Sequence, residues 1–256
     1  MHPFELSKSN RDLLARAFKN VTRVDIAIDS VIDGQMGEAF TDNLINPTVF
    51  MLRIGPFCYF AGSVHGEGVE AMIRNLPVHS LIMTCPSDWV ETAMKIHGSK
   101  LRRFPRYSFS SCTLTMRHIK GLLDKSPFRS RIVSIDRDLL VRISTEPDHF
   151  LDISTYDSID DFLNRGMGYC LTDGNTLCGV AYASLISHAA IEVSIYVVPD
   201  YRTKGVATAL ACALIKECLE NNREPHWDAA NIESCTLAEK LGYTASGTYD
   251  AFYLVP

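Results

Sequence analysis

The sequence predicts an α/β (α+β) protein of two domains, each built from a mixed sheet and flanking helices. Short apolar segments with strand-like alternation recur between segments of helical periodicity along the whole chain. The 256 residues suffice for one large domain or two small ones at about 150 residues per domain. Hydrophobic residues make up 46% and charged residues 21% of the chain, which excludes a disordered or fibrous protein.

The first half of the chain contains helices and strands separated by turn signals. Gly55–Pro56 is typical of a hairpin turn, Ser87 is expected to cap a helix, and Gly98 is expected to end that helix. Helices are predicted at about 6–18, 24–33, 67–76, 87–97 and 116–125, and strands at 48–54, 57–61, 80–84 and 104–114.

A domain boundary is predicted at Ser126–Pro127, because this pair interrupts a helical pattern. The charge balance changes nearby: residues 1–130 hold 16 basic and 12 acidic side chains, whereas residues 131–256 hold 9 and 18. We therefore expect a smaller N-terminal α/β domain over residues 1–126 and a second domain over residues 127–256.

The second domain shows a regular order of elements. Asp173–Gly174 is typical of a tight turn between two strands, and Gly242 is expected to end the last helix. Strands are predicted at 131–135, 168–172, 176–184, 190–198, 225–229 and 246–254, and helices at 137–143, 158–164, 205–221 and 231–241.

The order hairpin, helix, strand, helix, strand occurs twice, over residues 48–114 and again over residues 168–254. A degenerate structural repeat explains this recurrence. Chance explains it equally well, since mixed α/β chains often produce the same order.

The charge and hydropathy patterns exclude several kinds of partner. The acidic second half argues against nucleic-acid binding and suits a cationic substrate. The basic side chains in 100–106 indicate either an anion site or, more simply, a solvated strand edge. No stretch approaches the roughly 20 apolar residues of a membrane span, and the first residues lack the apolar core of a secretory signal.

Eight cysteines are present without a Cys-x-x-Cys pair or zinc-finger spacing to histidine. Most lie in apolar surroundings, which favours buried reduced thiols in a reducing, cytoplasmic compartment. We expect no metal. The sequence carries no signal for an oligomeric state.

The predicted strand 190–198 alternates between an aliphatic face and a face with polar groups. Glu192, Ser194 and Tyr196 share the second face with Val198. These side chains either face solvent or line a cleft.

A loop with a glycine and small residues follows this strand and opens the long helix at Gly205. Unpaired N–H groups at a helix start, together with the helix dipole, suit a phosphate or pyrophosphate. Gly205 permits close approach, Ala207 adds little bulk, and Thr208 can donate a hydroxyl hydrogen. The loop matches neither the Walker pattern nor the dinucleotide fingerprint, and a plain helix start is the alternative reading.

Two motifs in the second domain resemble those of the GNAT acetyltransferases. Arg202-x-x-Gly205-x-Ala207, after a Val-Val-Pro strand end, resembles the acetyl-CoA motif of that superfamily. The segment from Asn231 to Tyr243 is similar to its closing motif, at the right spacing. The run 227–231 and the region 45–57 further resemble the zwittermicin A resistance-type GNAT subfamily, a match over nearly the whole chain.

The resemblance implies a mixed sheet that is splayed open between strands 190–198 and 225–229, with the pantetheine arm of acetyl-CoA in the splay. The recurrent order of elements makes a degenerate GNAT-like repeat one interpretation of the first domain, with chance as the other. Asn231 and Ser234 would face the cofactor arm, although Asn231 is also a good helix N-cap. The cofactor-binding residues that it implies are Val197, Val198, Arg202, Lys204, Gly205, Val206, Ala207, Thr208, Asn231 and Ser234.

One position departs from the family pattern. Many GNAT enzymes carry a tyrosine one residue after the leucine of the closing motif, as the acid for the departing thiolate, and here that position is Ala238. Water or another group protonates the thiolate, or catalysis is weak or absent. Tyr196, Tyr201 and Tyr243 are near in sequence, and nothing in the sequence selects one of them.

Direct transfer to an amine requires a base, because an alkylammonium ion must lose a proton before it attacks. Glu192 on the polar face of the strand is the chosen base, although an exposed strand residue is the plain alternative. Ser194 and Asp228 are weaker candidates, and Asp228 is also suited to attract a cationic substrate.

The sequence therefore predicts an acetyl-CoA-dependent N-acetyltransferase that acts on a primary amine of a small molecule by direct transfer. A non-catalytic acyl-CoA-binding protein and a protein N-acetyltransferase are the alternatives.

Overall fold

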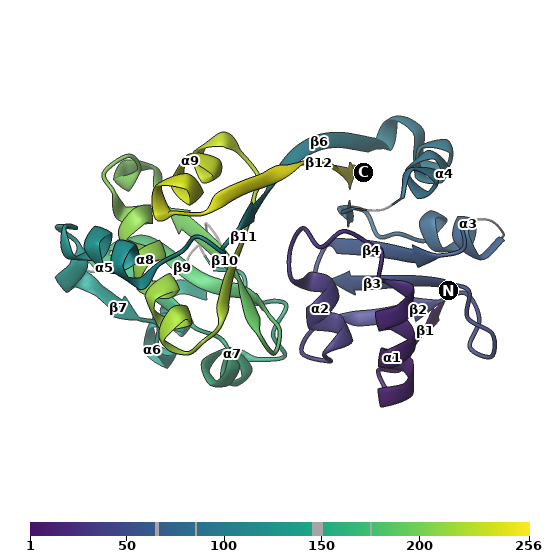
Figure 1. The fold of residues 1–256 in the computed structure, drawn as a ribbon, viewed down its shortest axis with the longest axis horizontal. Helices are drawn as coiled ribbons and strands as arrows, with labels where there is room; N and C mark the ends of the chain where they lie inside the picture. Colours follow the sequence, from purple (N-terminus) through teal and green to yellow (C-terminus); the bar gives the residue numbers. More distant parts are fainter. Residues whose placement is uncertain (65–66, 85, 145–150, 175) are drawn as a thin grey trace. The chain divides into compact units, whose positions relative to one another are not determined.

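The structure is a computed structural model of the chain that describes residues 1–64, 67–84, 86–144, 151–174 and 176–256. It contains two compact units (Figure 1). The first unit comprises Met1–Arg106 together with Thr248–Pro256, and the second unit comprises Tyr107–Gly247. The chain passes from one unit to the other within the strands β6 (Leu101–Ser110) and β12 (Thr244–Leu254).

The first unit is built on a mixed sheet with the strand order β1-β2-β3-β4-β5-β12. Neighbouring strands are antiparallel, except that β4 and β5 are parallel. The further elements of this unit are β1 (His2–Pro3), α1 (Lys8–Ala17), α2 (Ala27–Ile32), β2 (Glu38–Thr41), β3 (Val49–Ile54), β4 (Phe57–Gly62), α3 (Glu67–Arg74), β5 (Leu81–Ile82) and α4 (Ser87–His97).

Alternation along β3 and β4 places helices on both faces of this sheet. Met51 and Phe60 pack in one apolar cluster with side chains of α3 and α4. Tyr59, which points to the opposite face, donates its hydroxyl hydrogen to Asp25 just before α2. Helices α3 and α4 therefore cover one face of the sheet, and the segment that contains Asp25 and α2 covers the other face.

The second unit has the strand order β6-β11-β10-β9-β8-β7, again antiparallel except for one parallel pair, β10 and β11. Its further elements are α5 (Met116–Asp124), β7 (Ile132–Ser134), α6 (Arg137–Ser144), α7 (Ile159–Arg165), β8 (Gly168–Asp173), β9 (Thr176–Ile186), β10 (Ala190–Val197), α8 (Val206–Glu220), β11 (Glu224–Ala229) and α9 (Ile232–Leu241).

Both faces of this second sheet are also covered. On one face α5, α8 and α9 enclose an apolar cluster that includes Ile119, Ile215 and Trp227. On the other face the ring of Phe162 from α7 packs against Gly168, where an added Cβ would lie 3.3 Å from the Phe162 Cζ and 3.2 Å from the Tyr182 Cβ. The mixed, splayed α/β architecture expected from the sequence is confirmed.

The two units share one topology. Apart from α5, which precedes β7 in the second unit, each has a strand and two helices, then three antiparallel strands, and then a helix, a parallel strand and a second helix. The last strand of each sheet is contributed by the segment that follows the last helix of the other unit. β12 follows α9 of the second unit and pairs with β5, and β6 follows α4 of the first unit and pairs with β11. The recurrence seen in the sequence thus extends to strand order and strand direction.

The division between the two compact units differs from the expected boundary at 126/127, because it falls after residue 106 and again after residue 247. Helix α5 belongs with the second unit, because Ile119 is buried in its core and the His118 ring bonds the Lys240 carbonyl. The last nine residues belong with the first unit, because Phe252 and Leu254 are buried in its core. The change of charge near residue 130 therefore does not mark a boundary.

Two details of the first unit differ from the sequence-based assignment. Strands β1 and β2 are additional, since they are short and lie next to segments that read as loops. Pro86, not Ser87, is the N-cap residue of α4. The Ser87 hydroxyl donates to Asp88 instead of accepting a backbone N–H.

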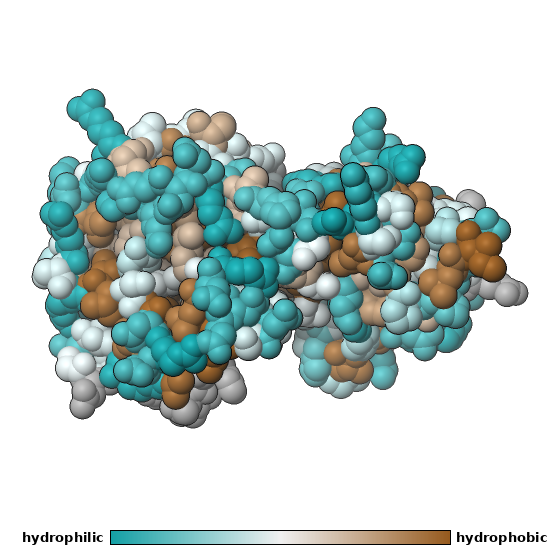
Figure 2. Space-filling view, turned by 90° about the horizontal axis from the view of Figure 1, so that it is seen from below, coloured by the Kyte–Doolittle hydropathy of each residue, from teal (hydrophilic) through white to brown (hydrophobic). Residues whose placement is uncertain are grey.

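The surface in Figure 2 is mostly hydrophilic, and its apolar areas are separated from one another by polar side chains. In the part of the chain that the structure describes, no helix combines the length and apolar character needed to cross a membrane.

Candidate active site

The central feature of the second unit is a separation between β10 and β11. These parallel strands pair from Ala190 to Glu192, and the last pair is Glu192 with His226. Beyond that point β11 pairs with β6 through Trp227, Asp228 and Ala229. β10 continues against β9, with a register irregularity between Glu192 and Val193. The strands therefore diverge like the two arms of a V.

A cavity of about 970 Å³ occupies this separation and extends to the starts of α8 and α9. Val193, Ile195 and Val197 form its wall on β10, and Trp227 forms its wall on β11. The remaining lining residues are Tyr196, Tyr201, Arg202, Thr203, Gly205, Val206, Ala207, Thr208, Asn231, Glu233, Ser234, Thr236, Leu237 and Lys240.

The N-terminus of α8 supplies donors to this cavity. Gly205 precedes the helix with a φ of 89°, a conformation that favours glycine, and a Cβ added there would meet no atom within 4 Å. The N–H groups in the first turn, at Val206, Ala207 and Thr208, have no partner within the helix itself. A 15-residue helix adds its dipole, so this end of the cavity suits an anion.

Two cations line the same region. The Arg202 Nε donates to the Val197 carbonyl at 3.0 Å, and its guanidinium lies 5.9 Å from the centre of the Tyr196 ring. The Lys240 Nζ donates to the Thr208 Oγ1 at 3.1 Å, which places an ammonium group at the start of α8. Sequence reasoning missed Lys240, although its helical spacing puts it on the same face of α9 as Glu233 and Leu237.

The start of α9 contributes polar groups to the opposite wall. The Asn231 Oδ1 accepts the Ser234 N–H at 2.8 Å, so Asn231 is the N-cap of this helix. The Ser234 Oγ accepts the Trp227 Nε1–H at 3.1 Å, and its own hydroxyl hydrogen remains available as a donor. Both residues line the cavity.

Glu192 lies at the point where the strands part, but it does not line the cavity. Its Oε2 is 2.9 Å from the His226 Nδ1, and its Oε1 accepts the Asp228 N–H at 3.1 Å. Trp227 lies between His226 and Asp228 on β11 and packs toward α8 and α9. Because side chains alternate along a strand, His226 and Asp228 point to the opposite face. The carboxylate therefore lies on the face of the sheet opposite α8 and α9, at the last residue pair before the strands separate.

The three tyrosines considered from the sequence have different surroundings. Tyr196 and Tyr201 line the cavity. A hydrogen bond from Tyr201 to Asp173 raises the pKa of the Tyr201 phenol to about 12. Tyr243 is buried and donates to the Pro225 carbonyl at 2.7 Å, and burial raises its pKa further. Ala238, a residue of α9, is fully buried in the core.

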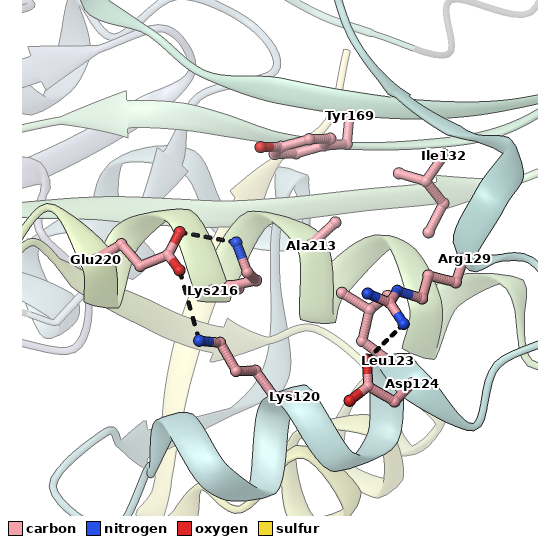
Figure 3. A pocket seen from close by; sticks show the side chains of 9 residues that line it. All are labelled: Lys120, Leu123, Asp124, Arg129, Ile132, Tyr169, Ala213, Lys216 and Glu220. Carbon is pink, nitrogen blue, oxygen red and sulfur yellow. Dashed lines mark hydrogen bonds and ion pairs between the residues drawn. The ribbon is translucent and has the colours of Figure 1, made fainter.

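A second cavity, of about 620 Å³, lies between α5, α8 and β8 (Figure 3). Its charged side chains pair with one another: Glu220 joins Lys216 and Lys120, and Arg129 reaches Asp124 at 3.0 Å. Burial, together with a hydrogen bond to Glu217, raises the pKa of the Tyr169 phenol at its edge. Since these charges compensate each other, the cavity between β10 and β11 is the better anion site.

Eight of the ten residues expected to bind the cofactor line the larger cavity, and Val198 and Lys204 do not. The Val198 N–H donates to the Cys178 carbonyl of β9, so this N–H is already used within the sheet. The Lys204 Nζ lies 5.4 Å from the centre of the Tyr201 ring, outside the cavity. Within the described ranges, the structure brings together no group of three His, Cys, Asp or Glu side chains suited to a metal ion.

Comparison with known proteins identifies the family. The family model described as GNAT acetyltransferase matches residues 16–252. A protein of Bacillus subtilis described as the uncharacterized N-acetyltransferase YdfB is 27% identical over 240 residues, which cover 88% of each chain.

Solved structures agree with this match. A GCN5-related N-acetyltransferase-like protein from Streptococcus suis superposes with a TM-score of 0.82 at 25% identity, over 95% of this chain and 97% of that one. A tandem GNAT protein from the clavulanic acid biosynthesis pathway, solved without acetyl-CoA, shares the fold alone: its TM-score is 0.53 at 10% identity, over 98% of this chain and 96% of that one. The chain therefore belongs to the GNAT acetyltransferase family and is an acetyltransferase.

Proposed function

We propose that this protein transfers the acetyl group of acetyl-CoA directly to a primary amine of a small molecule. The observation that carries the proposal is the cavity of about 970 Å³ between β10 and β11, which meets the N-terminus of α8 at Gly205. Its long apolar walls and cationic end match a molecule with a flexible arm and a phosphate group at one end. The resemblance in residues 227–231 and 45–57 supports a place in the zwittermicin A resistance-type subfamily, and the free thiols of the cysteines that the structure describes support a cytoplasmic location.

The residues present fit acetyl-CoA. The N–H groups of Val206, Ala207 and Thr208, with Lys240, would hold the pyrophosphate, and the space in front of Gly205 admits the phosphate oxygens. Asn231 and Ser234 would face the pantetheine arm. Bound there, acetyl-CoA supplies an activated thioester.

Glu192 would accept the proton of the acceptor ammonium, directly or through a water molecule. The neutral amine nitrogen then forms a bond to the acetyl carbon, the bond from that carbon to sulfur breaks, the nitrogen loses its second proton to water, and the thiolate takes up a proton. With Ala238 in place of the usual tyrosine, water or Tyr196 on the cavity wall would supply that last proton.

Acetyl-CoA titration, followed by thiol release with a panel of amines, tests the activity. We expect acetyl-CoA to bind, and we expect thiol to be released in the presence of small amines. Binding without release would favour an acyl-CoA-binding protein, and acetyl groups on lysines or N-termini of lysate proteins would favour a protein acetyltransferase.

Glu192→Gln tests the base. Turnover near pH 7 is expected to fall by about 10²–10⁴-fold and to recover at high pH, where the free amine is abundant. The affinity for acetyl-CoA is expected to stay the same. Glu239→Gln, an exposed carboxylate on α9, is the control and should retain turnover. Wild-type turnover of Glu192→Gln at every pH would remove Glu192 from the mechanism.

A further inference from the structure

We propose that His226 is a positioning residue for Glu192: its imidazole holds the carboxylate in the orientation in which it accepts the proton of the amine. This inference rests on the proposed function, because it assigns a role relative to the proposed base.

The register of the sheet creates the contact between the two side chains. Glu192 and His226 are the last paired residues of β10 and β11, 34 positions apart in sequence. Side chains of such a pair leave the sheet on the same face, and here the Nδ1 of one is 2.9 Å from the Oε2 of the other. Only 12% of the Glu192 side chain and 17% of the His226 side chain are exposed, so little solvent screens the contact.

Two donors from β11 together fix the carboxylate. The Asp228 N–H bonds one oxygen and His226 bonds the other, so rotation of the carboxylate would break both bonds. Each oxygen keeps a second lone pair, which can accept a proton from the substrate. A base fixed in this way loses little orientational freedom when the substrate binds, which is the source of much enzymatic rate enhancement.

The contact also defines a tautomer of the histidine. A neutral His226 that donates to Glu192 carries its proton on Nδ1, in the manner of histidines oriented by carboxylates in other sites. The donated hydrogen bond persists when the imidazole is protonated, so the orientation of Glu192 is kept in both charge states.

A comparison of His226→Leu with His226→Asn tests the role in catalysis. Leucine removes the donor, whereas asparagine places an amide N–H near the position of Nδ1. We expect kcat to fall by about 10–100-fold in His226→Leu, the size typical of residues that orient a functional group, with unchanged acetyl-CoA affinity. His226→Asn is expected to stay within about threefold of the wild type, since it keeps the donated hydrogen bond.

A double variant separates positioning from a structural effect. In the Glu192→Gln background, His226→Leu is expected to cause no further loss of kcat, because residues that act as one unit are not additive. Full additivity of the two losses, wild-type kcat in His226→Leu, or failure of asparagine to restore kcat would each overturn the proposal.

The tautomer can be measured without turnover. Nitrogen-15 NMR of the histidine side chains at a pH where they are neutral is expected to show the His226 proton on Nδ1, and a proton on Nε2 would overturn the proposal. If the wild type transfers no acetyl group while the Nδ1–H tautomer is present, the proposed function fails and the role in positioning a base fails with it. If transfer depends on Glu192 but not on His226, only this inference fails.

Discussion

At the level of single residues, Gly205 combines an unusual backbone conformation with a proposed role in cofactor binding. Its φ of 89° favours glycine, and a Cβ there would meet no protein atom within 4 Å. The absence of a side chain permits the turn into α8, and under the proposed function it would also let phosphate oxygens approach the first-turn N–H groups.

Gly205→Val is expected to weaken acetyl-CoA binding at least tenfold, about 1.4 kcal/mol, because its branches occupy the approach to these N–H groups. Titration calorimetry measures the affinity. Gly98→Val is the matched control, since Gly98 also has a positive φ of 54° and open space around it but lies at the end of α4. With its ψ of −129°, outside the left-handed helical region, the control should carry at least as much strain and still bind normally. Equal affinity of a folded Gly205→Val protein would contradict the assignment of the loop.

Lys240 is the residue that the structure adds to the predicted anion site. Its ammonium group reaches α8 from α9 and touches Thr208, so it can bond an anion held by the first turn of α8.

Lys240→Gln is expected to lower the affinity for acetyl-CoA by about tenfold, the size of a charge-assisted hydrogen bond. The affinity for acetyl-pantetheine, which lacks the pyrophosphate, should not change. Lys216→Gln is the control, because this lysine on α8 pairs with Glu220 in the other cavity. An equal loss for both ligands would place Lys240 on the pantetheine arm instead.

At the level of elements, the connection between β2 and β3 is held by one carboxylate. Asp42 accepts hydrogen bonds from the Thr48 N–H, the Thr48 hydroxyl and the Val49 N–H at 2.8–3.1 Å. Burial alone would raise the pKa of Asp42, but these hydrogen bonds outweigh it and hold the pKa below its usual value of 3.8.

This shift makes part of the stability dependent on pH. Because the pKa is lower in the folded state, the contribution is present above pH 3.8 and is lost as the pH falls through the folded value. Asp42→Asn is expected to lower the free energy of unfolding at pH 7 by about 1–2 kcal/mol, and its difference from the wild type should shrink below pH 3.8.

Urea unfolding at pH 7 and at pH 3 measures both effects. Asp12→Asn, an exposed position on α1, is the control and should change stability by less than about 0.5 kcal/mol. A difference for Asp42→Asn that is the same at both pH values would contradict the role of its charge.

At the level of the whole molecule, the two units have the same topology but different interiors at the position of the cavity. In the first unit β4 and β5 pair only as far as Cys58 and Ile82, as β10 and β11 pair only as far as Glu192 and His226. The third residue of α4 is Trp89, which stacks on Phe60 at 4.9 Å and is only 1% exposed. The third residue of α9 is the small Ser234. Aromatic side chains thus fill in the first unit what is a cavity in the second.

The chain is therefore expected to bind one acetyl-CoA, and titration should give a stoichiometry of one. The sequence 62–68 keeps the two glycines of the Arg-x-x-Gly-x-Gly/Ala pattern, at Gly66 and Gly68, but has Ser63 in place of the arginine. Gly205→Val should weaken the single binding event seen in this titration. Two sites per chain, or a tight site that survives Gly205→Val, would show that the first unit binds cofactor as well.

The sequence by itself determined most of the local structure. The α8 loop could be recognised because the role proposed for it needs backbone donors at a helix start, which a short run around Gly205 specifies. Helix ends such as Gly242 and hairpins such as Gly55–Pro56 are equally local, since a few neighbouring residues decide their backbone angles. Asn231 was expected both as a cap and as a cofactor contact. The structure shows the cap, and the cofactor contact stays a prediction.

Only the tertiary structure decided which distant segments meet. β6 pairs with β11 and β12 with β5 across more than 100 residues, so no local pattern revealed that 107–126 belongs with the second unit. The contact of Glu192 with His226 depends on the register of two parallel strands, and that of Lys240 with Thr208 depends on how two helices pack. Register and packing are set by the burial of whole faces of sheets and helices, which is a property of the assembled core and not of any one segment.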